Sequence, residues 1–312
     1  MLSGRNVALC INRERYRVYE ILMRNDNWQV VKDVEGYVLQ EHEAQIDKTD
    51  FSFFLNGKKV LIDVVLVMIH GTPGEDGILQ AYLESLHIPH TSSSAAVSAL
   101  TFDKYACKCA LRVAGIPMAK DMVLKQGEEI DEKAVVEKLG LPLFIKPNSG
   151  GSSFGAAKVS RIEELKPAIN EAFKECDTVL AEEYINGREL TNGILKTPDQ
   201  TVVLPVTEIV SKNSFFDYQA KYQGESFEFT PAPIEDALRD KVQYFSSKIY
   251  DHLGCKGFVR IDYMNRGEEI IFLEVNTIPG MTQMSLVPQQ VAASEMSLSD
   301  FLELLIESSL EI

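Results

Sequence analysis

The sequence has no long hydrophobic segment. Its longest apolar run near the middle of the chain, Val64–Ile69, has the size of a buried strand, whereas a membrane-spanning helix needs roughly 18 or more apolar residues. The N-terminal run Val7–Ile11 is also shorter than the apolar core of a secretory signal, which takes about 7–15 residues. We therefore expect a cytoplasmic protein without a membrane partner.

Cysteines are few, and basic residues are outnumbered by acidic ones. The 5 cysteines of this 312-residue chain are scattered, and Cys107 and Cys109 are spaced neither as zinc ligands nor as a redox pair, so we expect reduced side chains. The 31 basic and 46 acidic residues give a net charge of −15, which repels nucleic-acid backbones and excludes a general nucleic-acid partner. A polyanion site has to be built locally from lysines, backbone amides and metal ions.

Helix and strand patterns alternate along a chain long enough for two or three domains. The apolar runs Val7–Ile11 and Val64–Ile69 predict buried strands, and one helix is expected from Ala95 to Val113. Other helices are expected at Ile78–Leu86, Glu132–Leu139, Ile162–Phe173, Ala237–Leu253 and Leu298–Ser308. Other strands are expected at Met122–Leu124, Leu143–Lys146, Ala156–Val159, Thr178–Ile185, Phe258–Met264 and Ile270–Val275. The predicted domains are residues 1–99, 100–187 and 188–312.

The strongest functional signal is a set of four polar residues in two neighbouring apolar segments near the C-terminus. Side chains alternate between the faces of a strand, so Arg260 and Asp262 share one face, as do Glu274 and Asn276. A hairpin would bring Asp262 opposite Glu274 and Arg260 opposite Asn276. Two carboxylates and an amide oxygen suit Mg²⁺ when substrate phosphates complete its shell, and an arginine suits developing negative charge. The alternative, a surface salt-bridge cluster, is disfavoured because apolar residues flank all four.

A second signal is Lys146 followed by a loop rich in glycine and serine, which includes Ser152 and Ser153. Such loops let backbone N–H groups approach phosphate oxygens. This is not a Walker A loop, because the lysine precedes the glycines. Lys104, on an upstream helix, could supply another phosphate contact. The alternative interpretation is an ordinary turn and a solvated lysine.

A third signal lies at the end of a predicted strand. Alternation places Glu182 and Tyr184 on one face, suited to the amino group and ring of an adenine, and Glu189 beyond the next turn could reach ribose hydroxyls. Acidic strand ends are common, so this pattern alone is weak.

Two further segments are candidates for the remaining parts of a site. The stretch 216–222 crowds aromatic and charged residues, among them Lys221 and Tyr222, into a predicted loop, which is typical of a lid that excludes water. His70 follows a predicted buried strand, and such strand ends border ligand crevices in open sheets. A loop pinned by its aromatics and a structural histidine are the alternatives.

Taken together and in this order, these segments resemble the D-alanine–D-alanine ligases of the ATP-grasp superfamily. The resemblance covers roughly residues 64 to 290. The matching stretches are HGTPGEDGILQAYLESLHIP, SALTFDK, KPNSGGSSFGAAKV, EEYINGRE, FFDYQAKY and GCKGFVRIDYM…FLEVNTIPGMTQMSLVP. The resemblance implies a three-domain α/β ATP-grasp architecture, in which an N-terminal parallel-sheet domain precedes two mixed α+β domains that sandwich ATP.

The resemblance also assigns roles at the nucleotide. Lysines and loop serines would contact the ATP phosphates: Lys104, Lys146, Ser152 and Ser153. Glu182 and Tyr184, with Ile185 beside them, would line the adenine pocket, and Glu189 would bind ribose. Two Mg²⁺ ions, which Mn²⁺ could replace, would be held by Asp262, Glu274 and Asn276.

At the amino acids, the resemblance implies that two D-alanines are joined through a D-alanyl phosphate, as a step in peptidoglycan precursor synthesis. Arg260 and the backbone of Gly280 would stabilise the tetrahedral intermediate. His70 would place the first substrate, Ser285 would bind the carboxylate of the second, and Tyr222 would act with Ser152 and Lys221 near the first substrate. The family tendency is a homodimer.

The chain departs from the family pattern at its N-terminal side. A Gly-Gly-x-Ser-x-Glu stretch is usual in the family but is not found here, so Glu14 is the candidate for its glutamate. Ser92 stands at a usual glycine, and Ser294-Glu295 at a usual Ala-Gly. These changes leave two alternatives open: an ATP-grasp ligase acting on another amino-acid pair, and an inactive nucleotide-binding module.

Overall fold

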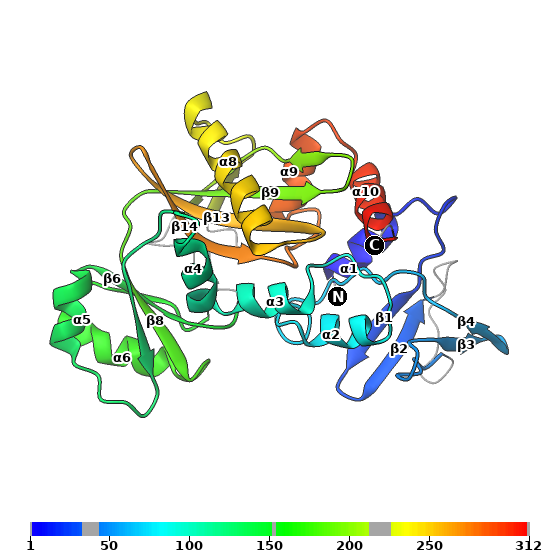
Figure 1. Cartoon of the computed structure of the whole chain (residues 1–312), viewed down its shortest axis with the longest axis horizontal. Coiled ribbons are helices and arrows are strands. Elements are labelled where there is room, and N and C mark those ends of the chain that lie inside the picture. Colours follow the sequence, from blue (N-terminus) through cyan, green and yellow to red (C-terminus); the bar gives the residue numbers. More distant parts are fainter. Residues whose placement is uncertain (1, 33–43, 152–153, 212–225, 311–312) are drawn as a thin grey trace.

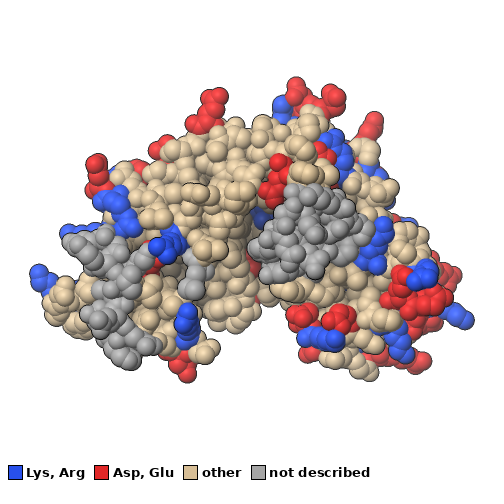
Figure 2. Space-filling model, turned by 180° about the vertical axis from the view of Figure 1, so that it is seen from behind, with Lys and Arg blue, Asp and Glu red and all other residues tan. Residues whose placement is uncertain are grey.

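The computed structural model describes residues 2–32, 44–151, 154–211 and 226–310. Three groups of elements lie around a common centre, with a small sheet and two helices at one end, N-terminal hairpins at the other, and a larger sheet above both (Figure 1). From the reverse side, the surface is hollowed at its lower edge between the two end groups (Figure 2). The described residues include no helix with both the length and the apolar character to cross a membrane. The mixed α/β architecture is the predicted one except for the N-terminal parallel sheet, and the boundaries near 99 and 187 stay predictions.

The N-terminal region is built from hairpins and helices. Its elements are α1 (Leu2–Cys10), β1 (Glu20–Arg24), β2 (Asn27–Lys32), β3 (Phe53–Leu55), β4 (Lys58–Val60) and α2 (Ile78–Ser85). The strand expected at Val7–Ile11 is wrong, because Ser3, Val7 and Ile11 recur every four residues and form the buried face of a helical segment. The hairpins β1–β2 and β3–β4 are antiparallel.

The run Val64–Ile69 does not form a strand either. Within the described residues, its one β-pairing is a parallel bridge between Val65 and His90. An apolar run becomes a strand only where a neighbour completes a ladder of hydrogen bonds, and a single bridge does not do so. The parallel sheet expected for this domain is therefore not formed by the described residues.

The central sheet follows the predicted order of elements. It has four antiparallel strands in the order β5-β8-β6-β7, and α5 and α6 pack on it around a core that includes Leu143, Leu165 and Val179. The elements are β5 (Asp121–Lys125), α5 (Glu132–Leu139), β6 (Leu143–Pro147), β7 (Ala157–Val159), α6 (Ile162–Ala172) and β8 (Thr178–Glu183). The β6–β7 hairpin confirms that the glycine-rich segment is a loop between two strands.

The C-terminal sheet runs β12-β11-β9-β13-β14, with β10 paired to β9, and is antiparallel throughout. Its strands are β9 (Arg188–Lys196), β10 (Thr201–Val203), β11 (Thr207–Ser211), β12 (Ser226–Phe229), β13 (Phe258–Arg266) and β14 (Glu269–Asn276). The helices are α8 (Asp236–Leu253), α9 (Leu286–Ala293) and α10 (Leu298–Leu310). Helix α9 was not predicted, because Pro288 reads as a helix breaker although the first turn tolerates it.

Alternation along β13 decides which face carries chemistry. Val259, Ile261 and Tyr263 are fully buried in one core with residues of α8. Phe258 points to the opposite face, where it packs with α9 and α10. Because side chains alternate, Arg260 and Asp262 lie on the face opposite α8. The packing of the sheet thus directs the polar residues of β13 away from its main core.

The helix expected from Ala95 to Val113 is in fact two helices, α3 (Ala95–Phe102) and α4 (Lys104–Arg112). The chain is extended at Asp103, whose side chain accepts a hydrogen bond of 2.8 Å from the N–H of Ala106 and so caps α4. A short polar side chain that can bond to the backbone favours a cap over a helix interior. The break places Lys104 in the first turn of α4.

Replacing Asp103 with alanine should lower the free energy of unfolding by about 1 kcal/mol, the usual loss for an N-cap. Asp131 offers a matched control, because it caps α5 in the same way through the N–H groups of Lys133 and Ala134. We expect similar urea-denaturation shifts for the two variants but, because the resemblance implies that Lys104 contacts ATP, a raised KM for ATP only in Asp103→Ala. Equal KM values for both would contradict the role of this cap in placing Lys104.

Candidate active site

The hairpin β13–β14 brings together the four polar residues that the sequence singled out. In the observed register, Asp262 lies opposite Glu274 and Arg260 lies opposite Asn276, as predicted. A bulge follows Asp262, so the register shifts only beyond these pairs. The hairpin therefore gathers two carboxylates, a carboxamide and a guanidinium on one patch.

Asp262 is the centre of this patch. Its Oδ1 accepts hydrogen bonds from Thr191 Oγ1 (2.6 Å) and Arg260 Nε (2.9 Å), and its Oδ2 accepts from Asn276 Nδ2 (3.0 Å). Burial alone would lower the pKa of Arg260, but the attraction of Asp262, and then of Glu274, outweighs burial and raises that pKa above its ordinary value. Arg260 thus stays charged beside the carboxylates.

A cavity of about 510 Å³ lies between the central and C-terminal sheets, and Arg260, Asp262 and Glu274 line one side of it. The other predicted residues that line it are Lys104, Lys146, Glu182, Tyr184, Ile185 and Glu189. They come from α4, β6 and the segment from β8 to β9. One cavity thus brings predicted phosphate, base and ribose residues together with Arg260 and the two predicted metal carboxylates, while Asn276 lies outside its lining.

Lysines face carboxylates inside this cavity. Lys104 Nζ donates to the carbonyl of Gly150 (2.9 Å) and lies 3.6 Å from Glu274 Oε2, while Lys146 Nζ lies 2.6 Å from Glu182 Oε2. Burial would raise the pKa of Glu182, but the ammonium groups of its lysine neighbours hold the pKa below its ordinary value. Glu182 is therefore an ionised hydrogen-bond acceptor, and two ammonium groups are available for anionic groups of a ligand.

The donor set of the hairpin fits Mg²⁺. The described residues hold no cluster of three or more His, Cys, Asp and Glu side chains suited to a metal. Mg²⁺ does not need one, because it is usually bound by one or two carboxylates together with substrate phosphates. Asp262 and Glu274 supply two carboxylates, and Asn276 adds an amide oxygen. The residues present thus fit a cation that arrives with a nucleotide.

His70 and the loop after β14 form a second group beside the hairpin. His70 Nδ1 lies 2.9 Å from the carbonyl of Ile278, and its Nε2 lies 3.1 Å from Ser3 Oγ. Burial lowers the pKa of His70, so its neutral form is favoured, with Nδ1–H as donor to the carbonyl. In the same loop, a Cβ added at Gly280 would lie 2.9 Å from Ser285 Oγ, so a side chain there would crowd that serine.

Not every predicted site residue comes to the cavity. Glu14 is exposed in a turn after α1 and is not among the residues that line the cavity. His70, Gly280 and Ser285 lie outside its lining as well, and His70 borders a separate groove of the N-terminal region. The predictions for Ser152, Ser153, Lys221 and Tyr222 fall outside the described residues.

The structure adds apolar walls that the sequence analysis missed. Phe144 lies two residues before Lys146, and Met264 two residues after Asp262, so strand alternation could have placed both at the cavity. Ile209 and Val210 of β11 carried no such signal.

The sequence analysis also missed a charged pair at the cavity. Arg188 and Glu208 form two hydrogen bonds of 2.6 Å there.

Comparison with known families shows to which family this chain belongs. The model described as D-ala D-ala ligase N-terminus matches residues 1–93, and the one described as D-ala D-ala ligase C-terminus matches residues 110–307. The chain belongs to the D-ala D-ala ligase family. The resemblance inferred from the motifs is thus confirmed, and the family relationship covers the N-terminal region as well.

Individual relatives in this family are similar over almost the whole chain. A D-alanine--D-alanine ligase of Phocaeicola vulgatus is 46% identical over 307 residues, which cover 98% of this chain and 93% of that protein. Among solved structures, the VanG D-Ala:D-Ser ligase from Enterococcus faecalis has a TM-score of 0.87 at 32% identity, covering 99% of this chain and 94% of that one. A Bacillus anthracis D-alanine--D-alanine ligase complexed with ATP has a TM-score of 0.70 at 33% identity, covering 80% of both chains.

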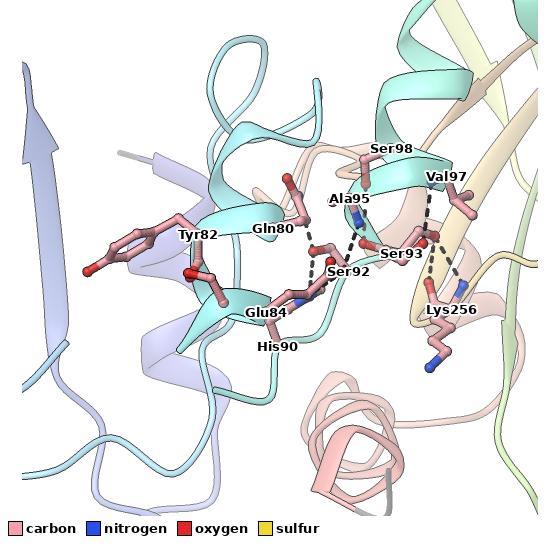
Figure 3. Close-up of polar contacts among 12 residues, drawn as sticks. Gln80, Tyr82, Glu84, His90, Ser92, Ser93, Ala95, Val97, Ser98 and Lys256 are labelled. Atoms are coloured by element: carbon pink, nitrogen blue, oxygen red, sulfur yellow. Dashed lines mark hydrogen bonds and ion pairs between the residues drawn. The ribbon is translucent and has the colours of Figure 1, made fainter. Parts of the chain in front are cut away.

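Two departures from the family pattern have visible structural settings. Ser92 is buried, and Gln80 and His90 both point at it (Figure 3), with Gln80 Nε2 at 3.2 Å and His90 Nδ1 at 3.0 Å from its Oγ. The hydroxyl thus adds polar contacts that a glycine would lack. Glu295, just after α9, has a φ of 63°, a conformation in which glycine would be unstrained.

Proposed function

We propose that this protein joins two D-alanines into D-alanyl-D-alanine and converts ATP to ADP and phosphate, supplying a peptidoglycan precursor. The observation that supports this most strongly is the single cavity shared by Lys104, Lys146, Arg260, Asp262 and Glu274. Relatives that are 39–46% identical over nearly the full chain are named D-alanine--D-alanine ligase. Retention of the arginine and both hairpin carboxylates argues against an inactive nucleotide-binding module.

The reaction needs an activated carboxylate. A carboxylate oxygen of the first D-alanine attacks the γ-phosphorus, the bond to ADP breaks, and a D-alanyl phosphate results. The amine of the second D-alanine then attacks the acyl carbon, the tetrahedral intermediate loses phosphate, and the amine loses a proton. Arg260 would stabilise the negative charge on the phosphoryl group and on the tetrahedral carbon's oxygen.

We assign the rest of the cavity by its charges. Lys104 and Lys146 bind phosphate oxygens, Glu182 accepts from the adenine amino group, and Glu189 binds ribose. Asp262, Glu274 and Asn276 would hold two Mg²⁺ ions, or Mn²⁺ in their place, which supply charge neutralisation at the phosphates. The proposal also includes a homodimeric, cytoplasmic enzyme, with Ser152, Ser153, Lys221 and Tyr222 in the closing segments.

The amino-acid side is assigned to the loop after β14 and its neighbours. His70, held by the Ile278 carbonyl, would help place the first substrate. Gly280 would donate its N–H to the intermediate, and Ser285 would bind the second carboxylate. Glu14 is not carried into this assignment, because it is exposed in a turn after α1, whereas His70 and the loop after β14 contact each other.

The second candidate is the same chemistry on another amino-acid pair. It is favoured by the similarity to the VanG D-Ala:D-Ser ligase, which superimposes over 99% of this chain. Both candidates use a first D-alanine, so they differ in the amine that attacks the acyl phosphate.

A substrate assay tests the proposal. The protein is incubated with Mg²⁺ and ATP and with D-alanine alone, then with D-alanine plus D-serine, and the products are identified by mass spectrometry. We expect ADP, phosphate and D-alanyl-D-alanine in the first mixture, and the same dipeptide as the main product in the second. Faster formation of a mixed dipeptide would support the second candidate, and no nucleotide-dependent dipeptide in either mixture would refute both.

A further inference from the structure

Helix α4 carries two lysines one turn apart, and only one of them reaches the nucleotide cavity. Lys104 lines the cavity, whereas Lys108 is fully buried and does not line it. The helix itself packs in the C-terminal core through Cys107 and Leu111. A fully buried lysine is costly unless it is paired, so the contacts of Lys108 need a reason.

Lys108 has three polar partners in the central part of the chain. Its Nζ contacts Asp121 Oδ2 at 2.8 Å and the carbonyl of Ala119 at 3.3 Å, and it forms an ion pair with Glu182 Oε1. Asp121 and Glu182 are directly opposed on the antiparallel strands β5 and β8. Like charges in such a cross-strand pair repel, and the ammonium group of Lys108 between them removes that repulsion.

The ion pairs form one chain from the surface to the cavity. Arg112 pairs with Asp121, Asp121 with Lys108, Lys108 with Glu182, and Glu182 with Lys146. Glu182 therefore has two cationic partners. Lys108 pairs with Oε1 on the side away from the cavity, and Lys146 pairs with Oε2 on the side that faces the cavity. When a triphosphate draws Lys146 away, Glu182 still keeps a counter-ion.

We propose that Lys108 is a positioning residue of the nucleotide site: it holds Glu182 Oε1 from behind, so that Oε2 faces the exocyclic amino group of the base and Lys146 is released to the phosphates. This inference rests on the proposed function, in which Glu182 accepts from adenine. Lys108 thus connects base recognition to the lysine that binds phosphate. Its action is indirect, because the side chain itself does not reach the cavity.

The competing explanation is that Lys108 only fastens α4, in the C-terminal core, to the central sheet. A purely structural contact would affect every nucleotide equally, whereas a residue that positions Glu182 would affect most strongly those nucleotides that carry an amino group at that place. ATP and purine riboside triphosphate differ in this one amino group. Their affinity ratio therefore separates the two explanations.

The experiment measures both affinities by calorimetry on the full chain with Mg²⁺ and without amino acids. Wild type should prefer ATP by roughly tenfold or more, the usual contribution of a hydrogen bond to a charged acceptor. Lys108→Met should bring this ratio close to one.

Lys108→Met leaves two buried carboxylates with fewer partners and could fail to fold. The double variant Lys108→Met/Asp121→Asn restores the charge balance and should show the same loss of preference for ATP. Arg112→Gln, at the exposed end of the same chain, is the matched control and should keep the wild-type ratio.

Each outcome has a distinct meaning. A folded Lys108→Met/Asp121→Asn variant that keeps the wild-type ratio overturns the inference, even if both affinities fall together. Wild type that binds both nucleotides equally overturns the inference and the assignment of Glu182 to the amino group, but leaves the ligase proposal standing. Wild type that binds neither nucleotide overturns the proposed function as well.

Discussion

Replacing Arg260 with alanine should lower turnover by about 100-fold or more, by analogy with the loss of one oxyanion-stabilising donor. The affinity for ATP should stay close to that of wild type, because the two cavity lysines remain. The requirement for Mg²⁺ should not increase, since Asp262 loses a competing cation but keeps its contacts with Thr191 and Asn276. Steady-state kinetics with calorimetric ATP binding measures all three quantities.

Arg266→Ala is the matched control for this variant. Arg266 lies on the same strand, but it is exposed and pairs with Glu269 at 2.9 Å, so its loss should leave turnover unchanged. Unchanged turnover in Arg260→Ala would remove Arg260 from the chemistry. A large loss of ATP affinity would instead make it a nucleotide-binding residue.

Replacing Glu274 with glutamine should raise the Mg²⁺ concentration for half-maximal activity by about tenfold or more. Loss of a residue that only supports a metal ligand already lowers metal affinity by roughly tenfold, and Glu274 is assigned as a ligand itself. A neutral amide is a weaker ligand than a carboxylate, and Asp262 is the one other carboxylate of this hairpin that lines the cavity. The change should also free Lys104, which lies 3.6 Å from Glu274. Activity as a function of Mg²⁺ at saturating ATP measures the effect.

Glu269→Gln controls for the change of charge on the same strand. Glu269 is exposed at the hairpin turn and pairs with Arg266, so the Mg²⁺ titration of this variant should match that of wild type. Identical titrations for Glu274→Gln and wild type would contradict the assignment of Glu274 to the metal.

The hairpin β13–β14 shows which parts of the site could be predicted from sequence. Alternation puts the polar residues of each strand on one face, and a tight turn between the strands fixes which residues lie opposite each other. The observed register matches the predicted one. The two lysines and Glu182 also line one cavity. These positions follow from local periodicity and motif spacing, whereas the roles of the residues at a nucleotide stay predictions.

Other parts depend on contacts that periodicity does not encode. Val64–Ile69 has the composition of a strand, but strand formation depends on a neighbour that supplies the hydrogen bonds. The break at Asp103 depends on a cap that competes with a continuous helix. The buried contacts of Lys108 could not be predicted, because a lysine on a helix is usually solvated. Only the fold brings Asp121 and Glu182 to it.

The central claim, that the cavity activates a carboxylate as an acyl phosphate, can be tested by following oxygen atoms. D-Alanine labelled with ¹⁸O in both carboxylate oxygens is supplied with Mg²⁺ and ATP, and the ¹⁸O content of each product is measured by mass spectrometry. We expect one ¹⁸O in the released phosphate and one in the new peptide carbonyl, because the attacking oxygen leaves with phosphorus. Unlabelled phosphate, or label in AMP, would contradict the acyl-phosphate mechanism.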